Sequence, residues 1–105
     1  TDAGAGGAYT AQIMPLTTST STALTLTATD NSVLIMNPAS NSTVNLPTAV
    51  GNANKVFHIK NIHATSIVTI DANGTQTIDG SITAVLSVQY QAIIIISDGS
   101  NWHVL

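Results

Sequence analysis

The sequence predicts an all-β domain, a short-stranded sandwich or β-prism-like module, and three observations carry this prediction. First, the residues that favour extended strands are abundant, with 16 Thr, 12 Ile and 8 Val among 105 residues. Second, apolar and polar residues alternate in several short stretches, which is the period of a half-buried strand. Third, turn-forming residues interrupt these stretches about every ten residues, a spacing typical of sandwiches and barrels.

The predicted strands follow one another from residue 22 onward. Residues 22–29 alternate Thr with Leu and Ala, and residues 56–62 place Phe57, Ile59 and Asn61 on one face. The remaining strands are shorter runs bounded by turn residues: 33–36, 44–46, 66–72, 75–79, 82–88, 92–96 and 102–105.

The chain divides into two parts on composition. Residues 1–21 begin with a Gly- and Ala-rich stretch and are predicted to be a flexible or extended segment that leads in from an upstream part of a fibre. Residues 22–105 are predicted to form one all-β domain, because they hold all the strand patterns and are of ordinary single-domain length.

An Asn-Gly pair at residues 73–74 predicts a hairpin. Both residues tolerate positive φ, which suits the two-residue type I′ turn of a tight hairpin. Counting outward from that turn pairs Asp71 with Gln76 and Val68 with Asp79.

A second hairpin is predicted at the Asp-Gly pair of residues 98–99, with Ile95 opposite Trp102. The isoleucines at 93–96 place apolar side chains on both faces of their strand, and a two-layer domain of this size covers only one of them. We therefore expect symmetric copies of the chain to cover the other face.

Charged residues make up only 7% of the sequence, and the formal net charge is −3. Two Lys cannot neutralise a phosphate backbone, so no nucleic-acid binding is expected.

The longest apolar run, residues 92–96, is far shorter than the ~20 residues of a spanning helix, so no membrane insertion is expected. The absence of Cys excludes disulfides and thiolate metal sites.

Four motifs occur in a fixed order in residues 37–105: LPTAVGN, KVFHIKN, TIDANGTQTIDG and the closing SDGSNWHVL. In this order and spacing they resemble a module of bacteriophage tail fibres and receptor-binding tips. The resemblance implies a homotrimer, intertwined or side by side, in the virion at the distal end of a tail fibre. There it would recognise a host-surface glycan, a polysaccharide or lipopolysaccharide, and mediate adsorption. Two alternatives stay open: a structural trimerisation or folding cap of a fibre, and a non-catalytic fragment of a capsule depolymerase tailspike.

We expect no catalytic residues, cofactor or metal. A glycosidase needs two nearby carboxylates, but the predicted register puts Asp71 and Asp79 on opposite faces. His58 and His63 are also expected on opposite faces of a strand. One His per copy, from His58, His63 or His103, would form a metal site only at a three-fold axis, and ordinary hydrogen-bonding histidines are the favoured interpretation.

The candidate glycan-binding residues are aromatic residues and their polar neighbours, since sugar rings stack on aromatic faces. Trp102 in the closing hairpin is the first candidate, with Asn101 and Asp98 as polar partners. Tyr90, which lies between two glutamines, is the second. The competing interpretation of Trp102 is a core residue, and we favour it.

Overall fold

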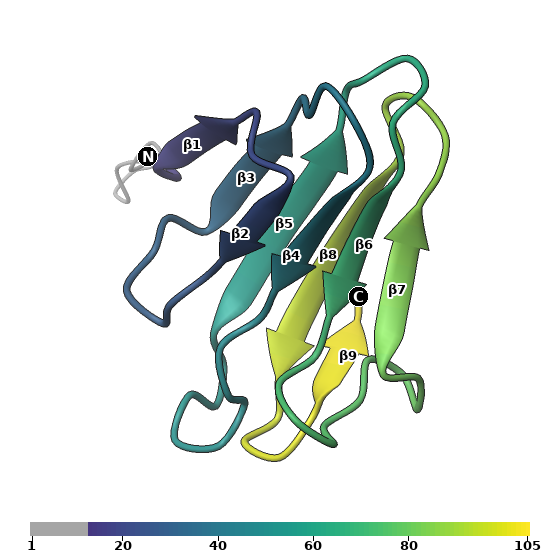
Figure 1. Cartoon of the computed structure of the whole chain (residues 1–105). Coiled ribbons are helices and arrows are strands. Elements are labelled where there is room, and N and C mark those ends of the chain that lie inside the picture. Colours follow the sequence, from purple (N-terminus) through teal and green to yellow (C-terminus); the bar gives the residue numbers. More distant parts are fainter. Residues whose placement is uncertain (1–12) are drawn as a thin grey trace.

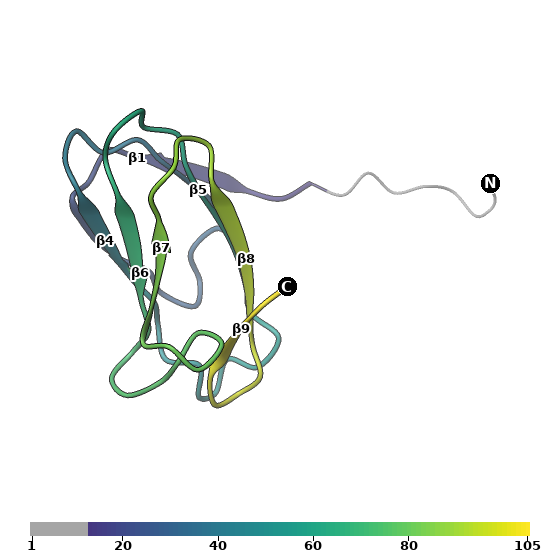
Figure 2. The ribbon, with the colours of Figure 1, turned by 90° about the vertical axis from the view of Figure 1, so that its right-hand side faces the viewer.

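A computed structural model describes residues 13–105, and in this range the chain is all-β, with nine strands in two facing sheets (Figures 1 and 2). No helix in this range is long and apolar enough to cross a membrane. The predicted all-β fold is confirmed. The strands are β1 (Leu16–Ser19), β2 (Ala23–Thr25), β3 (Val33–Met36), β4 (Ser42–Asn45), β5 (Val56–Asn61), β6 (Val68–Asp71), β7 (Thr83–Leu86), β8 (Ala92–Ser97) and β9 (Trp102–Val104).

The first six strands wind as three coils that alternate between the sheets. Strands β1, β3 and β5 pair in parallel in one sheet, and β2, β4 and β6 pair in parallel in the other. Parallel neighbours usually need a long crossover, and here the strand of the opposite sheet serves as that crossover. Each coil therefore adds one strand to each of the two sheets.

After β6 the chain reverses direction. Strand β7 pairs antiparallel with β6, and β8 crosses back to pair antiparallel with β5, followed by β9. The result is sheet A, with five strands in the order β1-β3-β5-β8-β9, and sheet B, with four strands in the order β2-β4-β6-β7. Strand β5 is the central strand of sheet A.

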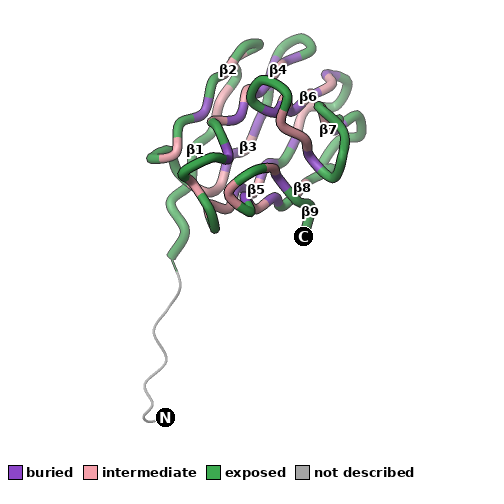
Figure 3. The backbone as a smooth tube through the Cα atoms, turned by 90° about the horizontal axis from the view of Figure 1, so that it is seen from below, coloured by how far each residue is buried: buried purple, intermediate pink, exposed green. Residues whose placement is uncertain are grey.

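The core fills the space between the two sheets, where buried positions alternate with outward ones along the strands (Figure 3). Phe57 and Trp102 meet there, with ring centroids 5.7 Å apart. Asn61 is also fully buried, as its predicted face requires, and its amide is fully bonded: Nδ2 donates to the carbonyls of Ser66 and Leu86, and Oδ1 accepts from the His63 amide. This one side chain ties β5 to a loop and to the end of β7.

The first predicted hairpin is wrong. Strand β6 pairs with β7, so Asp71 lies opposite Thr83, and residues 75–79 form no strand. A type I′ turn needs positive φ at both central residues, but of the pair only Gly74 has it, at 57°. The chain instead makes a turn closed by the Gln76 amide donating to the Asn73 carbonyl, 3.0 Å apart.

The segment after this turn crosses to sheet A. Ile78 forms isolated bridges with Ser81 and Trp102, the Trp102 amide donates to the Thr77 carbonyl, and the Asp79 amide donates to the Trp102 carbonyl. This segment therefore covers the outer edge of β9.

The second hairpin exists with a different register. Ser97 lies opposite Trp102 and Ile95 opposite Val104, so the loop has four residues rather than two. Asp98 causes this, because its Oδ1 accepts the amides of both Ser100 and Asn101, each 2.8 Å away. The shift is two residues, so Trp102 stays on the core face.

The predicted lead-in segment, residues 1–21, is described only from residue 13. Leu16–Ser19 form β1 and pair with β3, which makes this part the edge strand of sheet A. Residues 1–12 lie outside the described range.

Candidate functional site

The outer face of sheet A is largely apolar. The alternation of burial in β3, β5 and β8 sends Leu34, Phe57, Ile59 and Ile95 into the core and their neighbours outward. The outward side chains across the five strands are Leu16, Thr18, Val33, Ile35, Val56, His58, Lys60, Ala92, Ile94, Ile96 and His103. An apolar face of this extent on the outside of a sheet is typical of a surface that another molecule covers.

The outer face of sheet B has the opposite character. Its strands present Ala23, Thr25, Thr43, Asn45, Thr69, Asp71, Thr83 and Val85 in two cross-strand rows. Apart from Ala23 and Val85, these side chains are polar, so the outer faces of the two sheets differ in chemical character.

His58 lies at the centre of the outer face of sheet A. It belongs to the central strand and stands opposite Val33 on one side and Ile94 on the other, in the middle of three rows. Lys60 occupies the next row on the same strand, opposite Ile35 and Ala92. Its ammonium lies 5.7 Å from the centroid of the Tyr90 ring.

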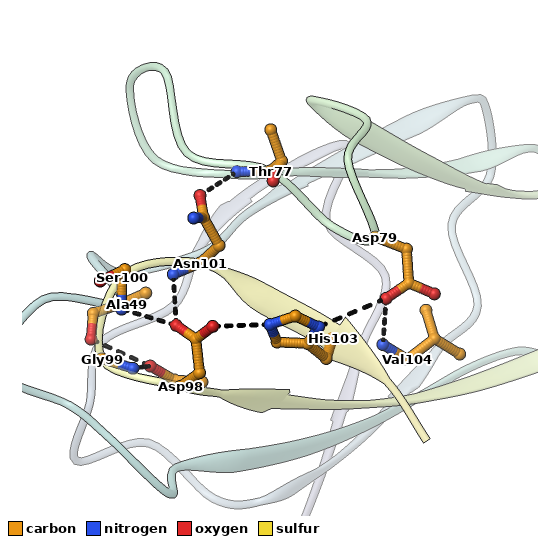
Figure 4. Close-up of polar contacts among 10 residues, drawn as sticks. Ala49, Thr77, Asp79, Asp98, Gly99, Ser100, Asn101, His103 and Val104 are labelled. Atoms are coloured by element: carbon orange, nitrogen blue, oxygen red, sulfur yellow. Dashed lines mark hydrogen bonds and ion pairs between the residues drawn. The ribbon is translucent and has the colours of Figure 1, made fainter.

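Three side chains meet at the edge of this face, around His103 (Figure 4). Its Nε2 lies 2.6 Å from Asp98 Oδ2, and its Nδ1 lies 3.9 Å from Asp79 Oδ1, which also accepts the Val104 amide at 3.0 Å. The Asn101 amide, the His103 side chain and the Ser100 amide all bond Asp98 and lower its pKa from 3.8 to about 2. Asp98 therefore stays ionised at neutral pH.

The predicted glycan-binding residues of the closing hairpin are engaged inside the chain. Trp102 is completely buried, so its ring offers no face to a sugar, and it occupies the core position that we favoured. Its Nε1 is buried and has no hydrogen-bond partner. Asn101 accepts the Thr77 amide at 3.0 Å, and Asp98 organises the loop as described above.

Tyr90 is the one predicted residue that presents its ring to solvent, with 62% of its surface exposed. Its φ is 70°, a left-handed conformation that is costly for a bulky side chain. The loop that holds it is well bonded, because Gln91 Oε1 accepts the amides of Ser87 and Val88, and Gln89 donates to the Ile62 carbonyl. The ring is thus held outward on a rigid turn.

The three histidines lie in different places. His63 uses Nδ1 to accept the amides of Thr65 and Ser66, which fixes its loop, and His103 is bound to Asp98. Between residues 13 and 105 the structure holds no group of three or more side chains suited to a metal ion.

Two cavities lie near the first coil. A small one of about 80 Å³ is lined by Thr17, Leu24, Leu26, Asp30, Asn31 and Leu34, at the open edge between the sheets. A second, of about 350 Å³, is lined by Thr18, Ser19, Thr20, Ile35, Asn37 and Ile62, on the outer side of sheet A. Neither contains an acidic pair or an exposed aromatic ring.

Two features escape sequence reasoning. The run of isoleucines predicts an uncovered face on β8, but only the strand pairing extends that face over five strands. The contact between Asp79 and His103 depends on the segment of residues 77–79, which crosses to sheet A. The Asn-Gly pair predicted a hairpin strand for these residues instead. Comparisons of this chain with protein-family models, with curated proteins and with solved structures find no match.

Proposed function

We propose that the chain is a homotrimeric, non-catalytic module of a bacteriophage tail fibre, assembled through the outer face of sheet A and acting near the tip that meets the host cell. The outer face of sheet A is the observation that carries this proposal. The resemblance of residues 37–105 to tail-fibre modules supplies the biological setting.

The occupant of the face is a second and third copy of the chain. Most of its outward side chains are aliphatic, and other copies of the chain present aliphatic side chains that can cover them. Among residues 13–105, the titratable side chains of this face are Lys60, His58 and His103, so few charges oppose close approach. Three such sheets packed around an axis parallel to the strands bury this face and leave the polar face of sheet B in water.

The arrangement around His103 favours structure over catalysis. A glycosidase needs a protonated carboxylic acid at working pH, whereas the pKa of Asp98 is lowered to about 2. Its oxygens are already used by two amides and an imidazole. These contacts hold the hairpin at the border of the proposed interface.

The assembly is tested by placing one charge on each outer face. Ile94→Lys puts an ammonium at the middle of the sheet A face, and Val85→Lys is the matched control on sheet B. Ile94 is 36% exposed and Val85 48%, so both positions tolerate a long side chain in a single copy. We expect Ile94→Lys to give single chains by light scattering, with an unchanged β-sheet circular dichroism spectrum, and Val85→Lys to keep the mass of the unaltered protein. Equal masses for the two variants would contradict the proposed interface.

A second function, recognition of a host-surface glycan, is favoured by Tyr90. Its ring is exposed, is held in a strained backbone conformation, and has the Lys60 ammonium over it. Strain of this kind at an exposed aromatic residue is typical of functional positions. An exposed aromatic ring of this kind can stack on a sugar.

Tyr90→Gly distinguishes the backbone strain at Tyr90 from contact of its ring with the glycan. Glycine adopts positive φ without cost, so the substitution relieves the strain and leaves thermal stability equal or higher. If Tyr90 contacts the glycan, the same variant loses binding to host cells while keeping its oligomeric mass. Unchanged adsorption would remove Tyr90 from the recognition surface.

A further inference from the structure

We propose that the association of the copies is regulated by pH through His58, which must be uncharged when the outer faces of sheet A are packed together. This inference rests on the proposed function, since it concerns the same interface. As the pH falls below neutral, protonation of His58 in each copy opposes assembly and releases single chains.

The position of His58 is the first support. It lies on the central strand of sheet A and in the middle row, between Val33 and Ile94. Packing this face against copies of itself removes the imidazole from water on every side. No hydrogen bond joins its ring to another group within residues 13–105, in contrast to the rings of His63 and His103.

The charges around His58 are the second support. On β5 itself, Lys60 is the other cation of the face. The outward residues of β1, β3 and β8 are Leu16, Thr18, Val33, Ile35, Ala92, Ile94 and Ile96, none of which titrates. Asp98 and Asp79 lie at the border of the face beyond β8 and are engaged with His103 on β9.

Desolvation in the interface and the charge of Lys60 both disfavour the protonated form of His58. Loss of water disfavours the imidazolium, and the like charge of Lys60 disfavours it further. No carboxylate on the neighbouring strands offsets either effect. A packed interface therefore favours the neutral form of His58 over its charged form.

The sign of the pH dependence follows from linkage. The separate copies bind more protons than the assembly, so association strengthens as the pH rises and weakens as it falls. An imidazole changes its charge between about pH 5 and 8, which sets the window. Each proton that must leave lowers the association constant up to about 10-fold per pH unit, so three copies give up to about 10³-fold per unit.

His103 is a control for His58. It lies at the border of the face, and its ring contacts Asp98 and Asp79 of the same copy. Its substitution therefore removes a histidine of the face without changing the residue at the centre of the proposed interface.

The experiment measures mass by light scattering at a fixed chain concentration from pH 8 to about pH 5.5, with a circular dichroism spectrum at each pH. Four proteins are compared: the unaltered chain, His58→Val, His58→Gln and His103→Gln. We expect the unaltered chain and His103→Gln to fall from oligomer to single chains, with their β-sheet spectra retained. His58→Val and His58→Gln cannot take up the proton, so whichever of them folds keeps its oligomeric mass throughout.

The outcomes distinguish this inference from the proposed function. An oligomer whose mass does not change down to pH 5.5, or a His58 variant that dissociates as the unaltered chain does, overturns the role of His58 and leaves the assembly standing. Loss of the β-sheet spectrum together with the mass, in the unaltered chain and a His58 variant alike, also overturns it. A single chain at pH 8 overturns the proposed trimer and this inference together.

Discussion

His58 and Ile94 lie opposite each other across the β5–β8 pair, on the side of sheet A that the core does not cover. One strand pair thus joins a titratable ring to an aliphatic side chain at the centre of an apolar face. In a single chain both groups contact water, and in an assembly both lose it. The stability of the assembly and its dependence on pH are therefore expected to originate in the same place.

Removal of the Trp102 side chain is expected to destabilise the protein strongly. The indole is completely buried against Phe57, so Trp102→Ala leaves a cavity and costs about 3 to 5 kcal/mol of unfolding free energy. Urea denaturation measures the loss. The control is Tyr90→Ala, an aromatic deletion at an exposed loop position, which is expected to change stability by about 0.5 kcal/mol or less. A small effect at Trp102 would contradict the core position.

Truncation of Asn61 is expected to be nearly as costly. Asn61→Ala removes the hydrogen-bond partner of the Ser66 and Leu86 carbonyls and of the His63 amide. A buried polar group that loses its partner lowers the free energy of unfolding by about 1 to 3 kcal/mol. Asn45→Ala is the matched control, because Asn45 lies on the outer face of sheet B, and its substitution is expected to be nearly neutral. Equal unfolding free energies for the two variants would show that the bonds of Asn61 contribute nothing.

The charge on Asp98 is expected to stabilise the closing hairpin at neutral pH. Its pKa is lowered to about 2 in the folded chain, so the stabilisation is complete above its ordinary value of 3.8 and is lost as the pH falls through about 2. Asp98→Asn keeps an acceptor for the loop amides but loses the charge. We expect its melting temperature to lie below that of the unaltered chain at pH 7, with the gap closing toward pH 2.

Asp71→Asn serves as the control for that series. Asp71 lies on the outer face of sheet B, opposite Thr83, and its carboxylate makes no hydrogen bond within residues 13–105. It is expected to leave the melting temperature unchanged at both pH values. A gap for Asp98→Asn that is as large at pH 2 as at pH 7 would assign the effect to packing and not to charge.

Local pattern locates most strands of this chain but not their pairing, and it errs twice on the strands themselves: residues 75–79 form no strand, and Leu16–Ser19 form β1. Residues 56–62 contain β5 because Phe57, Ile59 and Asn61 recur with a period of two, and this period determines which side chains are buried. The same period occurs in parallel and antiparallel strands, so it does not predict that β3 and β4 lie in different sheets. The Asn-Gly pair at residues 73–74 misled for a related reason: it fits a hairpin, but the strand that pairs with β6 comes later in the chain.

The candidate site is predictable in part for similar reasons. The isoleucines of β8 place apolar side chains on both faces of their strand, so the sequence alone predicts an apolar surface outside a two-layer core. Which residues join Ile94 and Ile96 on the uncovered face depends on β5 and β3 lying beside β8 in register. The contacts of His103 with Asp98 and Asp79 likewise depend on a four-residue loop and a crossing segment that composition does not predict.

The mass of the chain in solution near pH 8 shows whether copies of the chain associate. The apolar outer face of sheet A, shared among three copies, predicts a single species of about three times 10.8 kDa by light scattering. A monodisperse species of 10.8 kDa would show that this face is stable in water without a partner, and would contradict the proposed trimer.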